Sequence, residues 1–225
     1  MQKVVVGIFA HPDDEAFGPS GTLLKMASEG YDIHLILLTD GEAGINPDNT
    51  NDLGAVRLEE WRTATQILQT KQTYALHYPD GGLEDVTISE LDHRVQPILD
   101  EIISGYSMPI QLEVMTFEPN GITGHRDHIA ATQLAERLAK SLNVHKIWYF
   151  CLHGSQAPLG ETPYCEPSAC EDNYITTKVD VSPWLTNKLR AIDAHVTQQA
   201  DAEKLKQLGG ELLSLEYFRE TINPE

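Results

Sequence analysis

The feature that most constrains the fold is a nearly unbroken apolar run at positions 3–10 (KVVVGIFA), rich in β-branched residues. Runs of this kind are typical of parallel strands that are covered by helices on both faces. Residues 15–28 follow with helical periodicity, and Gly30 suits the position after a helix end. A second apolar run at 31–40 completes a strand–helix–strand unit, for which a right-handed crossover is expected.

The alternation of apolar runs and helical segments continues along the chain. Further strands are predicted at 73–78, 111–117 and 145–151, and further helices at 53–69, 88–104 and 127–142. The rest is predicted as a loop at 155–173, a strand at 174–181, a helix at 184–199 and a final helix. We therefore predict a single α/β domain over 1–225. Residues 1–152 would form a Rossmann-like, mostly parallel sheet with helices on both faces, and 153–225 a C-terminal strand–helix extension that completes the site.

Charge and composition restrict the function further. The formal net charge is −18, from 34 acidic and 16 basic residues, which disfavours binding to nucleic acid or to an anionic membrane. No run approaches the ~20 apolar residues of a membrane span, and the first residues lack a secretory signal pattern. Cys151, Cys165 and Cys170 form no CxxC pair and suggest free thiols, although Cys165 and Cys170 could pair in an oxidising compartment. We expect a cytoplasmic protein that acts on a small molecule.

Polar loops follow the first five predicted strands, and in a parallel sheet these loops meet at one edge. They read HPDDE (11–15), TDGEAG (39–44), YPDGGL (78–83), EPNGITGHRDH (118–128) and LHG (152–154). Four of the five contain carboxylates and three contain histidines. Because ligands of open α/β sheets bind beyond the carboxyl ends of the strands, we expect the functional site on this rim.

Two of these loops carry the residue types of a catalytic zinc site, which needs three His or carboxylate ligands and one open position. HPDDE offers His11 and one aspartate, and Pro12 restricts the backbone between them. GHRDH offers His125, Asp127 and His128 at the start of a predicted helix, where residues three apart face the same way. The residues alone leave open which of them bind the metal.

The order of the motifs resembles the LmbE/PIG-L-like zinc-dependent N-acetylglucosaminyl de-N-acetylases. AHPDDE follows the first strand, and GHRDH is similar to the family's H-x-D-H motif. The resemblance extends to TDGEAG, RLEE, YPDGG and KLRAIDAHVTQ and covers most of the chain. It implies that His11, Asp14 and His128 bind zinc. It also implies that Asp13 is the general base that takes a proton from water.

The resemblance implies two further catalytic residues in GHRDH. His125 would act as a general acid towards the leaving amine or would stabilise the oxyanion, and Asp127 would orient the His125 ring and support its charged form. One position departs from some relatives, which carry Tyr where this chain has Thr123. Either His125 and zinc would then suffice, or a substrate-side group such as His195 would assist. The alternative for His195 is an exposed helix histidine.

Contacts with the substrate are implied for Arg57 and Asp80, whose positions match family residues that hold sugar hydroxyls, and more weakly for Glu42. Each of the first two has a plain structural alternative. Arg57 could pair with Glu59 or Glu60 on its own predicted helix. Asp80 suits a turn in its own right.

The predicted activity is a zinc-dependent hydrolysis that removes the N-acetyl group from an N-acetylglucosamine-type sugar or small glycoside. Acetate and a free amine would be the products, and Fe²⁺ or Mn²⁺ could replace zinc at a His/Asp site. The resemblance makes a homo-oligomer plausible, and it leaves open whether the loop at 155–173 is a lid.

Three other functions are weighed against this one. An amidase could act on another amide of a sugar or thiol conjugate, and a metal-binding protein could use the same ligands without catalysis. A dinucleotide-binding protein is disfavoured, because AHPDDE stands where that class needs a glycine-rich turn.

Overall fold

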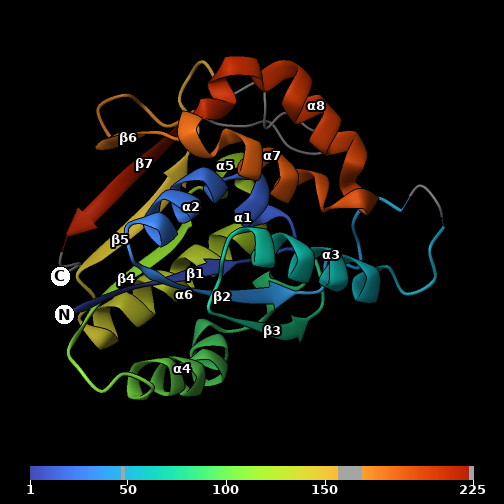
Figure 1. The fold of residues 1–225 in the computed structure, drawn as a ribbon. Helices are drawn as coiled ribbons and strands as arrows, with labels where there is room; N and C mark the ends of the chain where they lie inside the picture. The colour runs from blue at the N-terminus through green and yellow to red at the C-terminus, as the bar shows by residue number, and fades with distance from the viewer. Residues whose placement is uncertain (47–48, 157–168, 223–225) are drawn as a thin grey trace.

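The computed structural model describes residues 1–46, 49–156 and 169–222. Within these ranges the chain forms one seven-stranded sheet that lies between two layers of helices (Figure 1). The strands are β1 (Gln2–Phe9), β2 (Asp32–Thr39), β3 (Gln72–Tyr78), β4 (Ile110–Phe117), β5 (Lys146–Cys151), β6 (Thr177–Asp180) and β7 (Leu215–Ile222). Their order across the sheet is β3-β2-β1-β4-β5-β7-β6. The predicted α/β class with a mostly parallel sheet is confirmed.

The topology explains where the site lies. Strands β1 to β5 are parallel, and β7 is antiparallel to both β5 and β6. From β1 the chain first builds outward through β2 and β3, and then returns to place β4 on the other side of β1. The order of strands therefore reverses between β1 and β4, and such a switch point is where open α/β sheets bind ligands.

Helices cover both faces of the sheet. They are α1 (Asp14–Phe17), α2 (Ser20–Ser28), α3 (Leu53–Ile67), α4 (Ile88–Ser104), α5 (Gly121–Gly124), α6 (Arg126–Leu142), α7 (Leu185–Asp193) and α8 (Gln199–Gly209). Short 3₁₀ turns are η1 (Leu83–Asp85), η3 (Ser182–Trp184), η4 (Val196–Gln198) and η5 (Gly210–Ser214). On one face α7 packs against α2 and α3, and on the other α4 packs against α6 (Figure 1).

The core follows from the sequence pattern. Strands β1 and β2 are buried along nearly their whole length, as continuous apolar runs require. The helices instead bury one stripe each. In α4 that stripe is Leu91, Val95, Leu99 and Ile102, spaced three or four residues apart. These residues join one continuous core around the strands, which holds the loops of the rim on a rigid base.

The helix predicted at 15–28 is wrong as a single element. The chain forms α1 and α2 instead, with the break at Gly18 and Pro19. Proline has no amide hydrogen to continue a helix, and it clashes with the preceding turn. A side chain at Gly18 would also meet Phe150, because a Cβ there would lie 3.2 Å from the ring. The break lets α1 belong to the site while α2 packs on the sheet.

The C-terminal extension holds one strand that the sequence analysis missed. α8 is the predicted final helix, but β7 follows it and pairs with β5 and β6. The aromatic pair Tyr217 and Phe218 was the available signal, in a run too short and too mixed to decide between helix and strand. The predicted helix at 184–199 is also shorter, since α7 ends at Asp193 and η4 separates it from α8.

Two predictions concern residues that the structure does not describe. Most of the loop at 155–173 lies outside the described residues, and so does Cys165, for which a bond to Cys170 was considered. Cys151 and Cys170 are free thiols. Among the described helices, none is long and apolar enough to cross a membrane.

Candidate active site

The HPDDE turn leaves β1 at the switch point and contains a strained residue. Asp13 has a φ of 120°, which residues with a side chain rarely adopt. Asp14 begins α1, and its Oδ2 atom accepts hydrogen bonds from the backbone amides of Ala10 (3.1 Å) and His11 (2.7 Å). The other oxygen of Asp14, Oδ1, lies 3.3 Å from Nε2 of His128. One carboxylate thus shapes the turn and also faces the second half of the site.

The GHRDH segment supplies that second half at the end of β4. His125 is the N-cap of α6, and its Nδ1 atom accepts a hydrogen bond from the amide of Asp127 (3.2 Å). His128 donates through Nδ1 to the carbonyl oxygen of Gly121 (3.1 Å), so its Nε2 is the free nitrogen. Gly121 has a φ of 70°, and a Cβ there would lie 3.0 Å from Cβ of His128. Glycine at this position therefore allows the histidine to approach.

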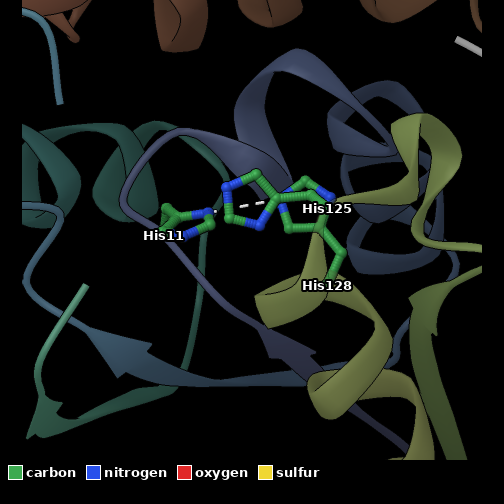
Figure 2. Close-up of side chains that lie close together, drawn as sticks. All are labelled: His11, His125 and His128. Atoms are coloured by element: carbon green, nitrogen blue, oxygen red, sulfur yellow. Dashed lines mark hydrogen bonds between the residues drawn. The ribbon is translucent and has the colours of Figure 1, made fainter. Parts of the chain in front are cut away.

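The three residues expected to bind metal meet between the two halves. Nδ1 of His11 lies 3.2 Å from Nε2 of His128 and 3.6 Å from Oδ2 of Asp14. All three side chains are at most 14% exposed. Figure 2 shows His11 reaching from its turn toward the histidines of α6. Two imidazole nitrogens with the Asp14 carboxylate beside them are ligand types that suit a divalent metal. Ligand atoms of His11, His125 and His128 also lie within 4.8 Å of one another, and so do those of His11, Asp80 and Asp127.

Electrostatics support the same interpretation. Burial opposes a charged His11, but hydrogen bonds to the carboxylates of Asp127, Asp14 and Asp80 outweigh it and hold the pKa of His11 well above its usual value. Burial likewise opposes a charged Asp14, yet the neighbouring His128 and His11 hold the pKa of Asp14 well below its usual value. The cluster thus stabilises a positive charge among carboxylates, which a divalent cation also provides.

Asp127 does not have the partner expected for it. Its carboxylate accepts hydrogen bonds from the amides of Gly81 (2.7 Å) and Leu83 (3.1 Å), and Oδ2 lies 3.3 Å from Nε2 of His11. The expectation that it orients His125 is therefore corrected. The first turn of α6 directs this side chain toward the loop after β3, where two amides and the His11 ring are its partners. It is fully buried.

The side chain of Asp80 is largely buried and, like that of Asp127, lies beside Nε2 of His11. Its Oδ1 atom lies 3.1 Å from Nε2 of His11, and its Oδ2 atom accepts a hydrogen bond from the amide of Ala43 (3.1 Å). Glu42, an exposed residue, accepts a hydrogen bond from the amide of Asp80 (2.9 Å). Metal-binding histidines usually donate their second nitrogen to a carboxylate in this way, which orients the ring.

Arg57 is a buried neighbour of Asp13. Its guanidinium donates to the carbonyl oxygens of Gly41 (2.6 Å) and Pro12 (2.8 Å) and to Oδ2 of Asp13 (3.0 Å). Arg57 therefore forms its ion pair with Asp13, and the alternative of an ion pair with Glu59 or Glu60 is wrong. Burial raises the pKa of Asp13 to about 6, with Asp14 adding to the rise and Arg57 opposing it. Asp13 is thus an ordered carboxylate whose pKa is close to neutral.

His125 packs against both other histidines. Its ring stacks on His128 at 4.7 Å between centroids, and it meets the His11 ring edge-on at 4.7 Å (Figure 2). Burial, with His128 and His11 adding to it, lowers the pKa of His125 to about 4. The ring is therefore neutral at pH 7. Since Nδ1 accepts from a backbone amide, the proton of the neutral ring lies on Nε2.

His195 is fully buried. The alternative that it is an exposed histidine on a helix is therefore wrong. Its Nε2 atom is 3.8 Å from Oε1 of Glu15, which is also fully buried. A contact between His195 and substrate stays a prediction.

One contact between α3 and η4 was not predicted from the sequence. Glu60 accepts hydrogen bonds from the amide (2.8 Å) and the hydroxyl (2.7 Å) of Thr197. The segments RLEE and HVTQ contain these two residues, and both belonged to the family resemblance. The two segments could therefore be recognised from the sequence, but the contact between Glu60 and Thr197 could not be predicted from it.

The chain matches the model of the PIG-L family, described as GlcNAc-PI de-N-acetylase, over residues 6–139. A 1D-myo-inositol 2-acetamido-2-deoxy-alpha-D-glucopyranoside deacetylase of Rhodococcus erythropolis is 30% identical over 239 residues, covering 87% of this chain and 81% of the relative. The protein with the same description in Mycobacteroides abscessus is 28% identical over 222 residues, covering 85% and 80%.

A solved structure shares the fold. The N,N'-diacetylchitobiose deacetylase from Pyrococcus horikoshii superposes with a TM-score of 0.65 at 22% identity, covering 99% of this chain and 84% of that one. At this level of identity the likeness concerns the arrangement of strands and helices. The chemistry has to be argued from the side chains of the rim.

Proposed function

Because the chain belongs to the PIG-L family of GlcNAc-PI de-N-acetylases, we propose that it deacetylates an N-acetylglucosamine unit in a small glycoside. Membership makes the protein a de-N-acetylase, a hydrolase of amide bonds. The reaction adds water across the amide, breaks the C–N bond, and releases acetate and the free amino sugar. The net charge of −18 favours a neutral or cationic substrate over an anionic surface.

The proposed metal ligands are His11, Asp14 and His128, with Zn²⁺ as the preferred ion and Fe²⁺ as an alternative. Their support is that the two imidazole nitrogens lie 3.2 Å apart, with Oδ2 of Asp14 3.6 Å from His11 and Oδ1 of Asp14 3.3 Å from His128. A bound divalent metal supplies Lewis-acid chemistry, which polarises a carbonyl group and acidifies a water molecule. Asp80 and Asp127 would hold His11 in its orientation from the opposite side of the ring.

Asp13 is the proposed general base. Arg57 bonds its Oδ2 atom at 3.0 Å, so Oδ1 is the atom that we assign to accept the proton of the attacking water. A pKa of about 6 suits this role, because a base is most effective when its pKa is near the working pH. The same carboxyl group can then deliver the proton to the departing amine, which completes the proton balance.

His125 is the proposed donor to the oxyanion. Its Nδ1 atom is occupied by the amide of Asp127, and the Nε2–H group is therefore the part of the neutral ring that can donate. Of the two roles that the sequence left open, stabilisation of the oxyanion fits a neutral ring, whereas a general acid would need a protonated one. Arg57, Asp80, Glu42 and His195 stay as proposed contacts with substrate, and of these Glu42 is the exposed one.

One observation carries the proposal: Asp13, a carboxylate held by Arg57, lies beside the proposed ligands His11 and Asp14. A structural metal site has no use for such a base. The test is acetate release from a panel of soluble N-acetylglucosaminides, after the metal-free protein is reconstituted with Zn²⁺ or Fe²⁺. Turnover that depends on added metal is the expected result. Hydrolysis of other amides alone would indicate a wider amidase, and metal binding without any hydrolysis would indicate a non-catalytic protein.

A further inference from the structure

A buried carboxylate and a buried imidazole face each other behind the HPDDE turn. Glu15 and His195 are both fully buried, and Oε1 of Glu15 lies 3.8 Å from Nε2 of His195. This distance is too long for a hydrogen bond. Both carboxylate oxygens and both ring nitrogens lack a hydrogen-bond partner among the described residues. Four such atoms in one place are unusual, because buried polar groups are normally paired.

Glu15 belongs to α1, a helix too short to be stable without contacts to the rest of the protein. α1 consists of four residues, and an isolated helical turn is unstable because nucleation is costly. Its first turn is closed by hydrogen bonds from the amides of Ala16 (2.9 Å) and Phe17 (2.8 Å) to the carbonyl oxygen of Asp13. Asp13 itself has the strained φ of 120°. Strain of this kind persists only where the surroundings hold it in place.

His195 contacts this turn at two points. Besides Glu15, it meets the Phe17 ring edge-on, with 6.1 Å between centroids. The backbone of His195 is in turn fixed, since its amide donates to Ile192 (3.2 Å) and its carbonyl accepts from the amide of Gln198 (3.1 Å). His195 therefore has a fixed backbone, and its side chain packs against α1.

Helix α3 forms hydrogen bonds both to Asp13 and to the segment after His195. On α3, Arg57 bonds Asp13, and one turn later Glu60 takes both the amide and the hydroxyl of Thr197. Residues three apart lie on one side of a helix. α3 thus ties the front of the HPDDE turn and the His195 segment to a single rigid element.

We propose that Glu15 and His195 are positioning residues that hold α1 from behind and thereby set the carboxylates of Asp13 and Asp14 in the site. The inference rests on the proposed roles of those two aspartates. In this assignment both residues act through α1, and the role given to the fully buried His195 replaces the substrate contact considered for it. The C-terminal segment becomes a necessary part of the metal site through their contact.

The test compares Glu15→Gln, His195→Gln and the double variant with His34→Gln. His34 is a matched control because it is a buried histidine, 1% exposed, near the amino end of β2, where its Nε2 atom lies 3.0 Å from the Tyr106 hydroxyl. The first readout is the Zn²⁺ dissociation constant, measured by competition with a chromophoric chelator. The second is kcat and KM for acetate release. Circular dichroism confirms that each variant is folded at the assay temperature.

We expect each single variant to bind Zn²⁺ about ten-fold more weakly and to lose about ten-fold or more in kcat, with KM nearly unchanged. The double variant should resemble the worse single variant, because the two residues act through one contact. Zn²⁺ binding and kcat equal to those of His34→Gln would overturn the proposal, and so would losses that add in the double variant. If the wild-type protein releases no acetate, the proposed function fails, while the Zn²⁺ measurement still decides this inference.

Discussion

Two buried polar clusters connect the C-terminal extension to the first half of the chain, and they are built in opposite ways. In the first, Lys188 and Glu216 form an ion pair at 2.6 Å with both side chains at most 3% exposed. Glu216 also accepts from the amides of Gly21 (2.8 Å) and Thr22 (2.7 Å), and Lys188 donates to the carbonyl of Gly18 (3.1 Å). Both buried charges in this cluster are paired and hydrogen-bonded, and we call it the clasp.

The second cluster is the rim around HPDDE, and it includes both a strained residue and buried groups without a hydrogen-bond partner among the described residues. Two carboxylates, Asp13 and Asp14, follow one another in a turn whose backbone is strained at Asp13. Glu15 is buried without a hydrogen bond among the described residues, and three histidine rings pack together close by. The difference indicates that the clasp exists for stability and the rim for chemistry, because unsatisfied and strained groups persist where function requires them. Changes in the rim should therefore reduce activity, and changes in the clasp should reduce stability.

The largest expected effect is on catalysis, from Asp13→Asn in the rim. Loss of the base should lower kcat by about 10²–10⁴-fold. Bound metal should stay near the wild-type level. The free energy of unfolding should change by less than about 1 kcal/mol, because Asn keeps an acceptor for Arg57 and replaces a carboxylate whose ionisation burial disfavours. Acetate-release kinetics, metal analysis and denaturant unfolding measure these three quantities. Full activity would remove Asp13 as the base, and loss of metal would exchange its role with that of Asp14.

The clasp should show the reverse behaviour in Glu216→Ala. Removing one partner leaves Lys188 buried without its counter-charge, and such changes destabilise proteins by about 3–5 kcal/mol. The kcat of the folded fraction should stay within about two-fold of wild type, since the clasp touches none of the proposed catalytic groups. Denaturant unfolding measures the loss. Glu29→Ala, at an exposed pair with Lys25, is the control and should change stability by at most about 1 kcal/mol. A large fall in kcat without destabilisation would contradict the comparison.

Metal removal should lower the stability of the rim by an intermediate amount. A metal that binds only the folded chain adds about 2.7 kcal/mol when present at a hundred times its dissociation constant. Thermal unfolding with Zn²⁺ and with a chelator should differ accordingly. Asp14→Asn should abolish this difference, whereas Asp100→Asn, on the exposed side of α4, should keep it. An equal metal-dependent shift in both variants would rule out Asp14 as a ligand.

The smallest effect is a pH dependence at Glu118, a buried carboxyl group after β4. Burial raises the pKa of Glu118 to about 7, from an ordinary value of 4.5. The folded protein then keeps this proton to higher pH than the unfolded chain. The stabilisation is complete below the unfolded value and is lost as the pH rises through about 7.

Glu118→Gln cannot lose a proton, so between about pH 5 and pH 8 it should lose roughly 1–3 kcal/mol less stability than wild type. Unfolding curves over this range measure the difference. The exposed control Glu90→Gln should follow the wild-type profile. Parallel profiles for wild type and Glu118→Gln would show that Glu118 titrates normally in the folded protein.

Much of the fold was predictable because its signals are local. The apolar runs of β1 and β2 and the stripes of α4 and α6 identify themselves by their periodicity within one window. β7 and the break between α1 and α2 were not predicted. The strand depends on pairing with β5 and β6, which are distant in sequence, and the break depends on a proline at a position where a helical pattern continues.

The proposed site shows the same division. The chain order of HPDDE and GHRDH, together with a parallel sheet, predicted that the two motifs meet. The family resemblance singled out His11, Asp14 and His128, whose nitrogen and oxygen atoms do lie together. The side-chain partners of Asp127 and Arg57 could not be predicted. They are set by backbone groups of other loops, such as the amides of Gly81 and Leu83.

The sequence by itself determined the fold class, the family and the residue types of the rim, because patterns of apolar residues and short motifs are properties of the chain. Only the tertiary structure decided that Asp127 holds His11, that Arg57 braces Asp13, and that His195 is buried beside Glu15. The physical reason is that a buried polar group takes whichever partner the packed chain brings within hydrogen-bonding or charge-pairing distance. That partner comes from an element far away in sequence.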